Sequence, residues 1–95
     1  MAIPYLQNPS AVAKDIPLNP ADILTDEQKA AFTAIEKERP GIVLELCSSM
    51  GDGGRLLAQA MWTHEGDTFN CSARGEKAVA TLLRSIRYVI DQGKA

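Results

Sequence analysis

Residues 55–90 of this chain read RLLAQAMWTHEGDTFNCSARGEKAVATLLRSIRYVI. This stretch decides the fold, because it holds a turn, the segments on both sides of that turn, and a long amphipathic helix. The helix is the clearest element, since apolar side chains recur at helical spacing from residue 76 to residue 92, and Gly93 then ends it. Its apolar positions are Ala78, Val79, Leu82, Leu83, Ile86, Val89 and Ile90. The pattern predicts one buried helical face.

The segment before the turn, residues 55–63, admits two interpretations. Its residue types favour a helix intrinsically, which would bury a stripe of Leu56, Leu57, Ala60 and Met61. As a strand, it would place on one face Leu56, Ala58, Ala60 and Trp62. The turn signal at residues 64–67, HEGD, is followed by the alternating segment TFNCSA. A hairpin accounts for both sides of this turn, so we expect a strand, with the helix as the alternative.

Two further elements precede this stretch. The sequence TDEQ at residues 25–28 has the pattern of a capping box, and Arg39-Pro40-Gly41 ends a helix, so a helix is predicted over residues 26–38. Its apolar stripe should consist of Ala31, Phe32 and Ile35. Residues 41–48, GIVLELCS, alternate between two faces and predict a strand that buries one of them.

The N-terminal residues 1–22 form a different kind of segment. They carry four prolines, which remove backbone donors and restrict φ, so neither a helix nor a central strand should run through them. They also hold too many apolar residues for a free linker. We expect an extended arm that docks by its side chains, either on its own domain or on another protomer or partner. Its candidates for a protein interface are Tyr5, Leu6, Ile16 and Leu18.

The order of these elements predicts the fold class. A helix, three strands joined by short turns, and a second helix form an α+β domain of the order α-β-β-β-α. One face of the three-stranded antiparallel sheet would be covered by the two helices. We therefore expect an extended N-terminal arm at residues 1–22 and one compact domain at residues 23–95, a size that suits a single core.

Composition excludes several classes of protein. The net charge of -2 is too small for a polyanion that mimics nucleic acid, and the hydrophobic fraction of 45% is typical of a globular domain. No apolar run approaches the roughly 18 residues that span a bilayer, and the N-terminus lacks the pattern of a signal peptide. We expect a cytoplasmic protein without membrane contact, in which Cys47 and Cys71 are buried thiols.

Groups that could carry catalysis are sparse. His64 is the single histidine and falls in the predicted turn, where it lacks a nucleophile and an orienting group. Cys47, His64 and Cys71 have no close-spaced pair of the kind that binds zinc. The glycine-rich residues 51–54 lack the lysine and hydroxyl of a phosphate-binding loop. The sequence therefore predicts no enzymatic activity, no metal and no cofactor.

Cations and aromatic residues supply the remaining candidates. Four cations at the start and on the exposed face of the last helix could contact a nucleic acid or another anion, although a solvated helix face is the alternative. These are Arg74, Lys77, Arg84 and Arg87. Trp62 fits the core, but an exposed Trp62 or Tyr88 would anchor a protein interface. Both are retained as interface candidates.

The hairpin and the last helix, AMWTHEGDTFNCSARGEKAVATLLRSI, resemble the double-stranded RNA-binding domain. In that family a hairpin precedes a basic, alanine-rich helix start, and Arg74, Lys77 and Ala78 take comparable places here. The resemblance covers roughly residues 25–90 and is topological. The family's lysine-rich KKxAK start is reduced to RGEKA, its histidine-bearing turn is replaced by residues 48–54, and the first helix is acidic on its exposed side.

These patterns predict a small non-catalytic binding protein, either an adaptor or an inhibitor, in the style of phage or mobile-element accessory proteins. It would act through protein–protein interaction or as a homo-oligomer. The alternative is a degenerate domain of the double-stranded RNA-binding kind, which would contact a nucleic-acid backbone through the four cations.

Overall fold

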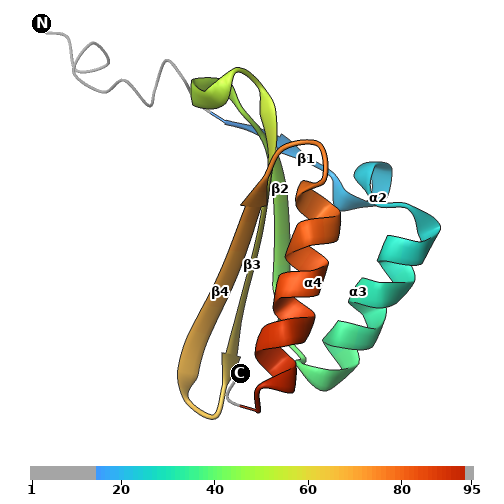
Figure 1. The fold of residues 1–95 in the computed structure, drawn as a ribbon, viewed down its shortest axis with the longest axis vertical. Coiled ribbons are helices and arrows are strands. Elements are labelled where there is room, and N and C mark those ends of the chain that lie inside the picture. The colour runs from blue at the N-terminus through green and yellow to red at the C-terminus, as the bar shows by residue number, and fades with distance from the viewer. Residues whose placement is uncertain (1–14, 94–95) are drawn as a thin grey trace, which may run out of the picture.

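The computed structural model describes residues 15–93, except for the side chain of Asp52. Figure 1 shows a sheet with helices on one of its sides. The elements in chain order are β1 (Ile16–Leu18), α2 (Pro20–Ile23), α3 (Asp26–Glu38), β2 (Val43–Ser49), η2 (Met50–Asp52), β3 (Arg55–His64), β4 (Asp67–Arg74) and α4 (Ala78–Asp91).

The strands form one antiparallel sheet in the order β1-β2-β3-β4. The β3–β4 hairpin is continuous from the pair Leu57–Arg74 to the pair His64–Asp67. Its two-residue turn has positive φ at both Glu65 (52°) and Gly66 (86°), as the twist of a tight hairpin requires. Residues 55–63 are therefore a strand, as we predicted.

Alternation along β3 explains why the strand prevails over its helical residue types. Ala58, Ala60 and Trp62 are buried against the helices, while the residues between them point to the other side of the sheet. The two alanines are small, so the adjoining α4 can lie close to the sheet. Tertiary packing of an alternating strand thus outweighs the intrinsic helix preference of this segment.

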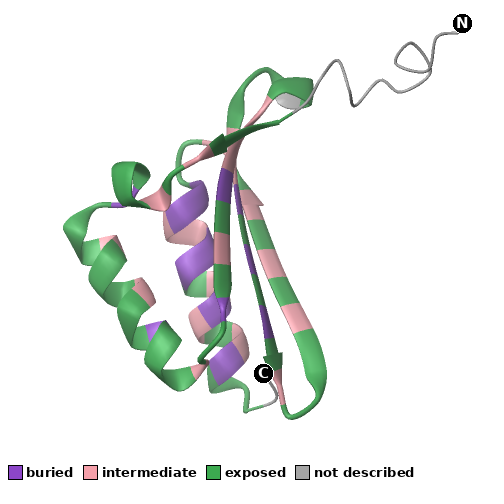
Figure 2. Cartoon of the chain, turned by 180° about the vertical axis from the view of Figure 1, so that it is seen from behind, coloured by how far each residue is buried: buried purple, intermediate pink, exposed green. Residues whose placement is uncertain are grey.

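Helix α4 supplies most of the residues that the helices contribute to the core. Figure 2 shows these buried residues of α4 in purple. The predicted stripe is confirmed: all of its residues are buried except Val89, which is half-buried and packs against the core. Helix α3 begins with the predicted capping box, in which the Thr25 hydroxyl accepts from the Gln28 backbone N–H and the Gln28 side chain accepts from the Thr25 N–H. It packs chiefly against α4 rather than against the sheet.

Two expectations about this architecture were wrong. The sheet has four strands, because Ile16–Leu18, within the stretch expected to be an arm, pairs with β2. Proline excludes a central strand, but a short edge strand tolerates it, since one side of an edge strand needs no donors. In addition, Ala31 is exposed, because α3 turns mainly Ile35 and part of Phe32 toward the core. Tyr5 and Leu6 lie outside the described residues.

Candidate protein-interaction surface

The face of the sheet turned away from the helices is not covered by any other element that the structure describes (Figure 1). We call it the open face. Residues directly opposite each other in an antiparallel sheet point to the same side, so the register assigns its members. From β2 and β3 they are the pairs Val43–Met61, Glu45–Gln59 and Cys47–Leu57, which β4 continues with Asn70, Ser72 and Arg74.

Two large apolar side chains lie exposed on the open face. Val43 is 55% exposed and Met61 is 52% exposed, and they stand directly opposite each other at the end of the β2–β3 ladder. Most of the surrounding side chains are polar. Because the apolar pair gains nothing from the core behind the sheet, its burial requires something that covers this face.

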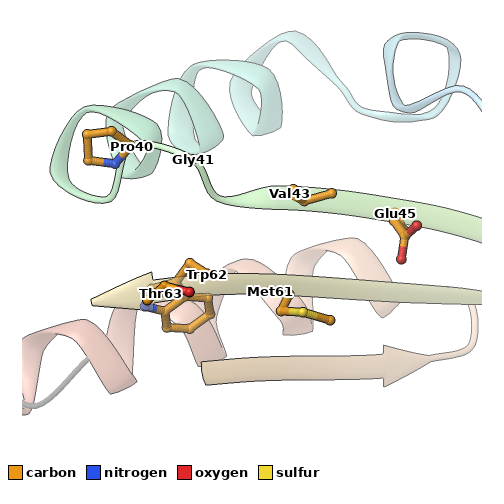
Figure 3. A pocket seen from close by; sticks show the side chains of 7 residues that line it. All are labelled: Pro40, Gly41, Val43, Glu45, Met61, Trp62 and Thr63. Atoms are coloured by element: carbon orange, nitrogen blue, oxygen red, sulfur yellow. The ribbon is translucent and has the colours of Figure 1, made fainter. Parts of the chain in front are cut away.

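A shallow depression of about 370 Å³ lies beside this pair. Figure 3 shows its origin: the chain leaves β2 toward Pro40, while β3 continues to Thr63, so the two strands separate. Val43, Met61 and Pro40 make its walls apolar, and Glu45 adds a carboxylate. The depression can therefore accept an apolar side chain with a cationic group beside it.

Trp62 also lines this depression, but it belongs to the core. It is 2% exposed and stacks on Phe69, with ring centroids 5.8 Å apart. Its place among the even-numbered residues of β3 turns it toward the helices. Of the two roles that the sequence left open, a core residue and an exposed interface anchor, Trp62 therefore has the first. Its indole Nε1 is buried and has no hydrogen-bond partner among the described residues.

The other interface candidates lie on different parts of the molecule. Tyr88 is 66% exposed on the outer side of α4, beside Arg84 in a second open depression of about 430 Å³. Ile16 is exposed on β1, whereas Leu18 is half-buried and packs against the core. The structure therefore does not bring these residues into one patch, and their role stays a prediction.

The four cations that the sequence predicts as anion contacts also do not act as one group in the structure. Arg87 donates two hydrogen bonds to the Glu38 carboxylate, and it also bonds Asp91. Its hydrogen bonds hold the pKa of Glu38 below its usual value and raise the pKa of Arg87. The charge of Arg87 is thus compensated within the protein.

Of the remaining cations, Lys77 occupies the N-cap position of α4 without a side-chain capping bond, and Arg84 is exposed on the same helix. Arg74 lies at the end of β4 and belongs to the open face. A role for these residues in binding an anion stays a prediction.

The chemically reactive side chains do not converge. Cys47 lies on the open face of β2, while Cys71 lies on the helix side of β4, with β3 between them, and both are free. Burial raises the pKa of both thiols, and Asp15 adds to the effect at Cys47, which weakens them as nucleophiles at neutral pH. The His64 Nε2 lies 3.7 Å from the Glu65 carboxylate in the hairpin turn.

Neither a metal-binding cluster nor a membrane-spanning helix is found among the described residues. Between residues 15 and 93, no group of three His, Cys, Asp or Glu side chains is placed to hold a metal ion. Among the helices of this same part of the chain, none is long and apolar enough to cross a membrane.

Sequence reasoning missed the pair of Val43 and Met61. A signal was present, because Val43 falls on the otherwise polar face of the segment 41–48. Met61 could be assigned to a face only after residues 55–63 were known to be a strand. Their opposition depends on the register, which no local pattern specifies.

Comparison of the chain with protein-family models, with curated proteins and with solved structures finds no match.

Proposed function

We propose that this chain is a small non-catalytic binding protein that docks a protein partner on the open face of its sheet. The observation that carries the proposal is the exposed, directly opposed pair of Val43 and Met61 beside the depression at the end of the β2–β3 ladder. Buried apolar side chains at the centre of an interface supply most of its binding energy.

The chemistry of the depression describes the partner. An apolar side chain of the partner would fill the space between Val43 and Met61, and a lysine or arginine beside it would meet Glu45. The polar residues Gln59, Asn70 and Ser72 would form the rim, where hydrogen bonds and water are usual. A partner segment with one apolar anchor and one cation matches this surface.

The test uses two exposed methionines as a matched pair. Met61→Asp places a charge in the depression, whereas Met50→Asp makes the same change on η2, where the wild-type side chain is 47% exposed. The immobilised full chain and both variants are incubated with extract from the source cell, with and without nuclease, and retained proteins are identified by mass spectrometry. The retained protein is then purified and titrated against each variant.

The proposal expects one protein that binds the wild type and Met50→Asp, with binding to Met61→Asp weakened at least about 10-fold, which is ~1.4 kcal/mol. Equal binding to both methionine variants contradicts the open face as the docking site. Retention that disappears with nuclease, together with an affinity that falls steeply with salt, supports the nucleic-acid alternative instead. Circular dichroism of both variants verifies that each remains folded.

The N-terminal arm is tested separately. Deleting residues 1–14 leaves β1 in place, so the sheet is retained. If Tyr5 and Leu6 contribute to binding, as the sequence predicts, the deletion weakens binding of the same partner without lowering thermal stability. Unchanged affinity would restrict the interface to the described domain.

A further inference from the structure

The two edges of the sheet differ in a way that points to a specific use of one of them. The β1 edge has only three residues and contains Pro17. The β4 edge has eight residues, from Asp67 to Arg74. Exposed edge strands are templates for pairing with another strand, and proteins usually shorten, bend or charge them. Only the β1 edge carries such protection.

The direction of the β4 backbone groups follows from one hydrogen bond. The N–H of Gly75 donates to the carbonyl of Leu56 over 2.9 Å, and the register places these two residues opposite each other. Hydrogen-bonded and non-bonded pairs alternate along an antiparallel ladder. The pairs Ala58–Ala73, Ala60–Cys71 and Trp62–Phe69 are therefore the bonded ones.

The intervening residues of β4 turn their backbone groups the other way. The N–H and C=O groups of Thr68, Asn70 and Ser72 consequently point away from β3, toward the free side of the sheet. The same alternation applied to β1 directs the ring nitrogen of Pro17 outward. The short edge thus lacks a donor where the long edge presents three.

Nothing in β4 blocks a new strand. Between Asp67 and Arg74 the sequence TFNCSA contains no charge, proline or glycine. The β3–β4 register advances one residue at a time over the whole strand, so no bulge bends the edge. The residues whose backbone groups point outward, Thr68, Asn70 and Ser72, have exposed side chains that are polar and uncharged. A second strand can therefore approach this edge.

We propose that two copies of this chain pair antiparallel through β4 and so join their four-stranded sheets into one continuous sheet. The charges at the ends of β4 favour a second copy in this direction. Asp67 begins the strand on the helix side and Arg74 ends it on the open face, so an antiparallel copy brings the acidic end of each strand near the basic end of the other, without a direct pair between them. A parallel copy would instead place like charges directly opposite each other. The interface is isologous and therefore closes as a dimer.

The backbone also restricts the position of the two-fold axis. Hydrogen-bonded pairs across the new interface must join outward-pointing residues, so the axis passes through a residue of β4, and the paired segment is longest when that residue is Asn70 or Cys71. In both cases the half-buried Phe69, Cys71 and Ala73 on the helix side gain cover from the second copy. This inference rests on the proposed role as a binding protein, but it concerns the edge of the sheet and leaves the depression at Met61 accessible.

The first test is the mass of the full chain in solution, measured by sedimentation equilibrium up to about 1 mM, where even a millimolar interface is half occupied. The average mass of the wild type, with a chain mass of 10.3 kDa, should rise with concentration toward twice that value. Ser72→Pro removes an outward donor and leaves the β3–β4 bonds in place, so the dimer should be lost. Ser72→Thr keeps the donor and should dimerise as the wild type does. Should Ser72→Pro fail to fold, Asn70→Lys places a charge near the axis and should likewise give a monomer.

Hydrogen exchange of individual amides provides the second measurement. In the dimer the amides of Thr68, Asn70 and Ser72 should exchange slowly, and in Asn70→Lys those of Thr68 and Ser72 should exchange fast while Phe69 and Cys71 stay protected. A wild type that is monomeric throughout, a dimer that survives Asn70→Lys, or fast exchange at these positions in a dimer overturns the proposal. Each of these outcomes leaves the proposed function intact, because that function fails only when Met61→Asp binds the partner normally.

Discussion

The guanidinium of Arg87 on α4 donates two parallel hydrogen bonds to the carboxylate of Glu38 at the end of α3, over 2.6 and 2.8 Å. The two residues are 49 positions apart in the sequence, and their pairing joins the two long helices at one end. Two parallel bonds fix orientation as well as distance. Since α3 packs chiefly on α4 and little on the sheet, this bridge helps to set the position of α3.

Replacing Arg87 should loosen this helix pair. Arg87→Ala removes the bonds to both Glu38 and Asp91, so we expect thermal unfolding to shift down by a few degrees and α3 amides to exchange faster. Arg84→Ala is the matched control, because Arg84 is exposed on the same helix. Equal melting temperatures of the two variants would show that the bridge does not stabilise the domain.

The same bridge makes a component of stability dependent on pH. The hydrogen bonds from Arg87 lower the pKa of Glu38 from an ordinary value of 4.5, so the folded protein binds the carboxylate proton less readily than the unfolded chain does. The stabilisation is present above about pH 4.5 and is lost as the pH falls through the lowered pKa. The stability difference between wild type and Glu38→Gln, measured by urea titration, should therefore shrink below pH 4.5. A difference that stays constant from pH 7 to pH 3 would contradict this linkage.

Ile86 should be among the most sensitive core positions. It is fully buried on the sheet side of α4. Ile86→Ala should lower the free energy of unfolding by about 2–5 kcal/mol, since lost contacts and a cavity both contribute. Tyr88→Ala on the exposed side should change it by no more than about 0.5 kcal/mol. Denaturant titration checks both values, and a similar loss at the two positions would contradict the observed orientation of α4.

The capping box at the start of α3 gives a smaller, local prediction. Thr25→Ala removes the hydroxyl that accepts from the Gln28 N–H at 3.1 Å, and the stability should fall by about 1 kcal/mol. Thr33 is the control, because its hydroxyl only bonds back to the Lys29 carbonyl within the helix. Thr33→Ala should be neutral or slightly stabilising, because alanine favours a helix, whereas the hydrogen bond from the Thr33 hydroxyl to the Lys29 carbonyl does not stabilise one. Calorimetry of both variants measures the contrast.

The hairpin turn offers a stabilising change. Glu65 has a φ of 52°, a left-handed conformation that costs energy for most side chains. Asparagine tolerates this conformation and commonly precedes glycine in such turns, so Glu65→Asn should raise stability by about 0.5–1 kcal/mol. Glu65→Gln removes the charge and keeps the strain, and it should not stabilise. A gain in both variants would assign the effect to charge instead.

Elements with local signals were predicted well. The capping box and the terminal proline set the bounds of α3, and the spacing of apolar residues identified the buried side of α4. The turn at residues 64–67 correctly outweighed the helix-favouring composition of β3. These successes share a cause, because each signal lies within a few residues of the structure that it specifies.

The candidate surface was predicted poorly, for the opposite reason. Trp62 was kept as a candidate for both the core and an interface, and its place in the alternation of β3 buries it against the helices. Arg87 was grouped with cations that could contact an anion, yet Glu38 from another helix compensates its charge. Both outcomes depend on elements distant in the sequence, the helices that cover Trp62 and the Glu38 carboxylate that meets Arg87, and their positions appear only when the helices and strands are packed.

By itself, the sequence determined the α+β class, the two long helices and the hairpin, because periodicity, caps and turn residues act over short distances. Only the tertiary structure decided that Ile16–Leu18 joins the sheet as a fourth strand, and that Val43 meets Met61 on the open face. It also decided that β4 ends the sheet with its outward donors available. Register and strand order join residues far apart in the chain, and they follow from how all the elements bury their apolar faces together.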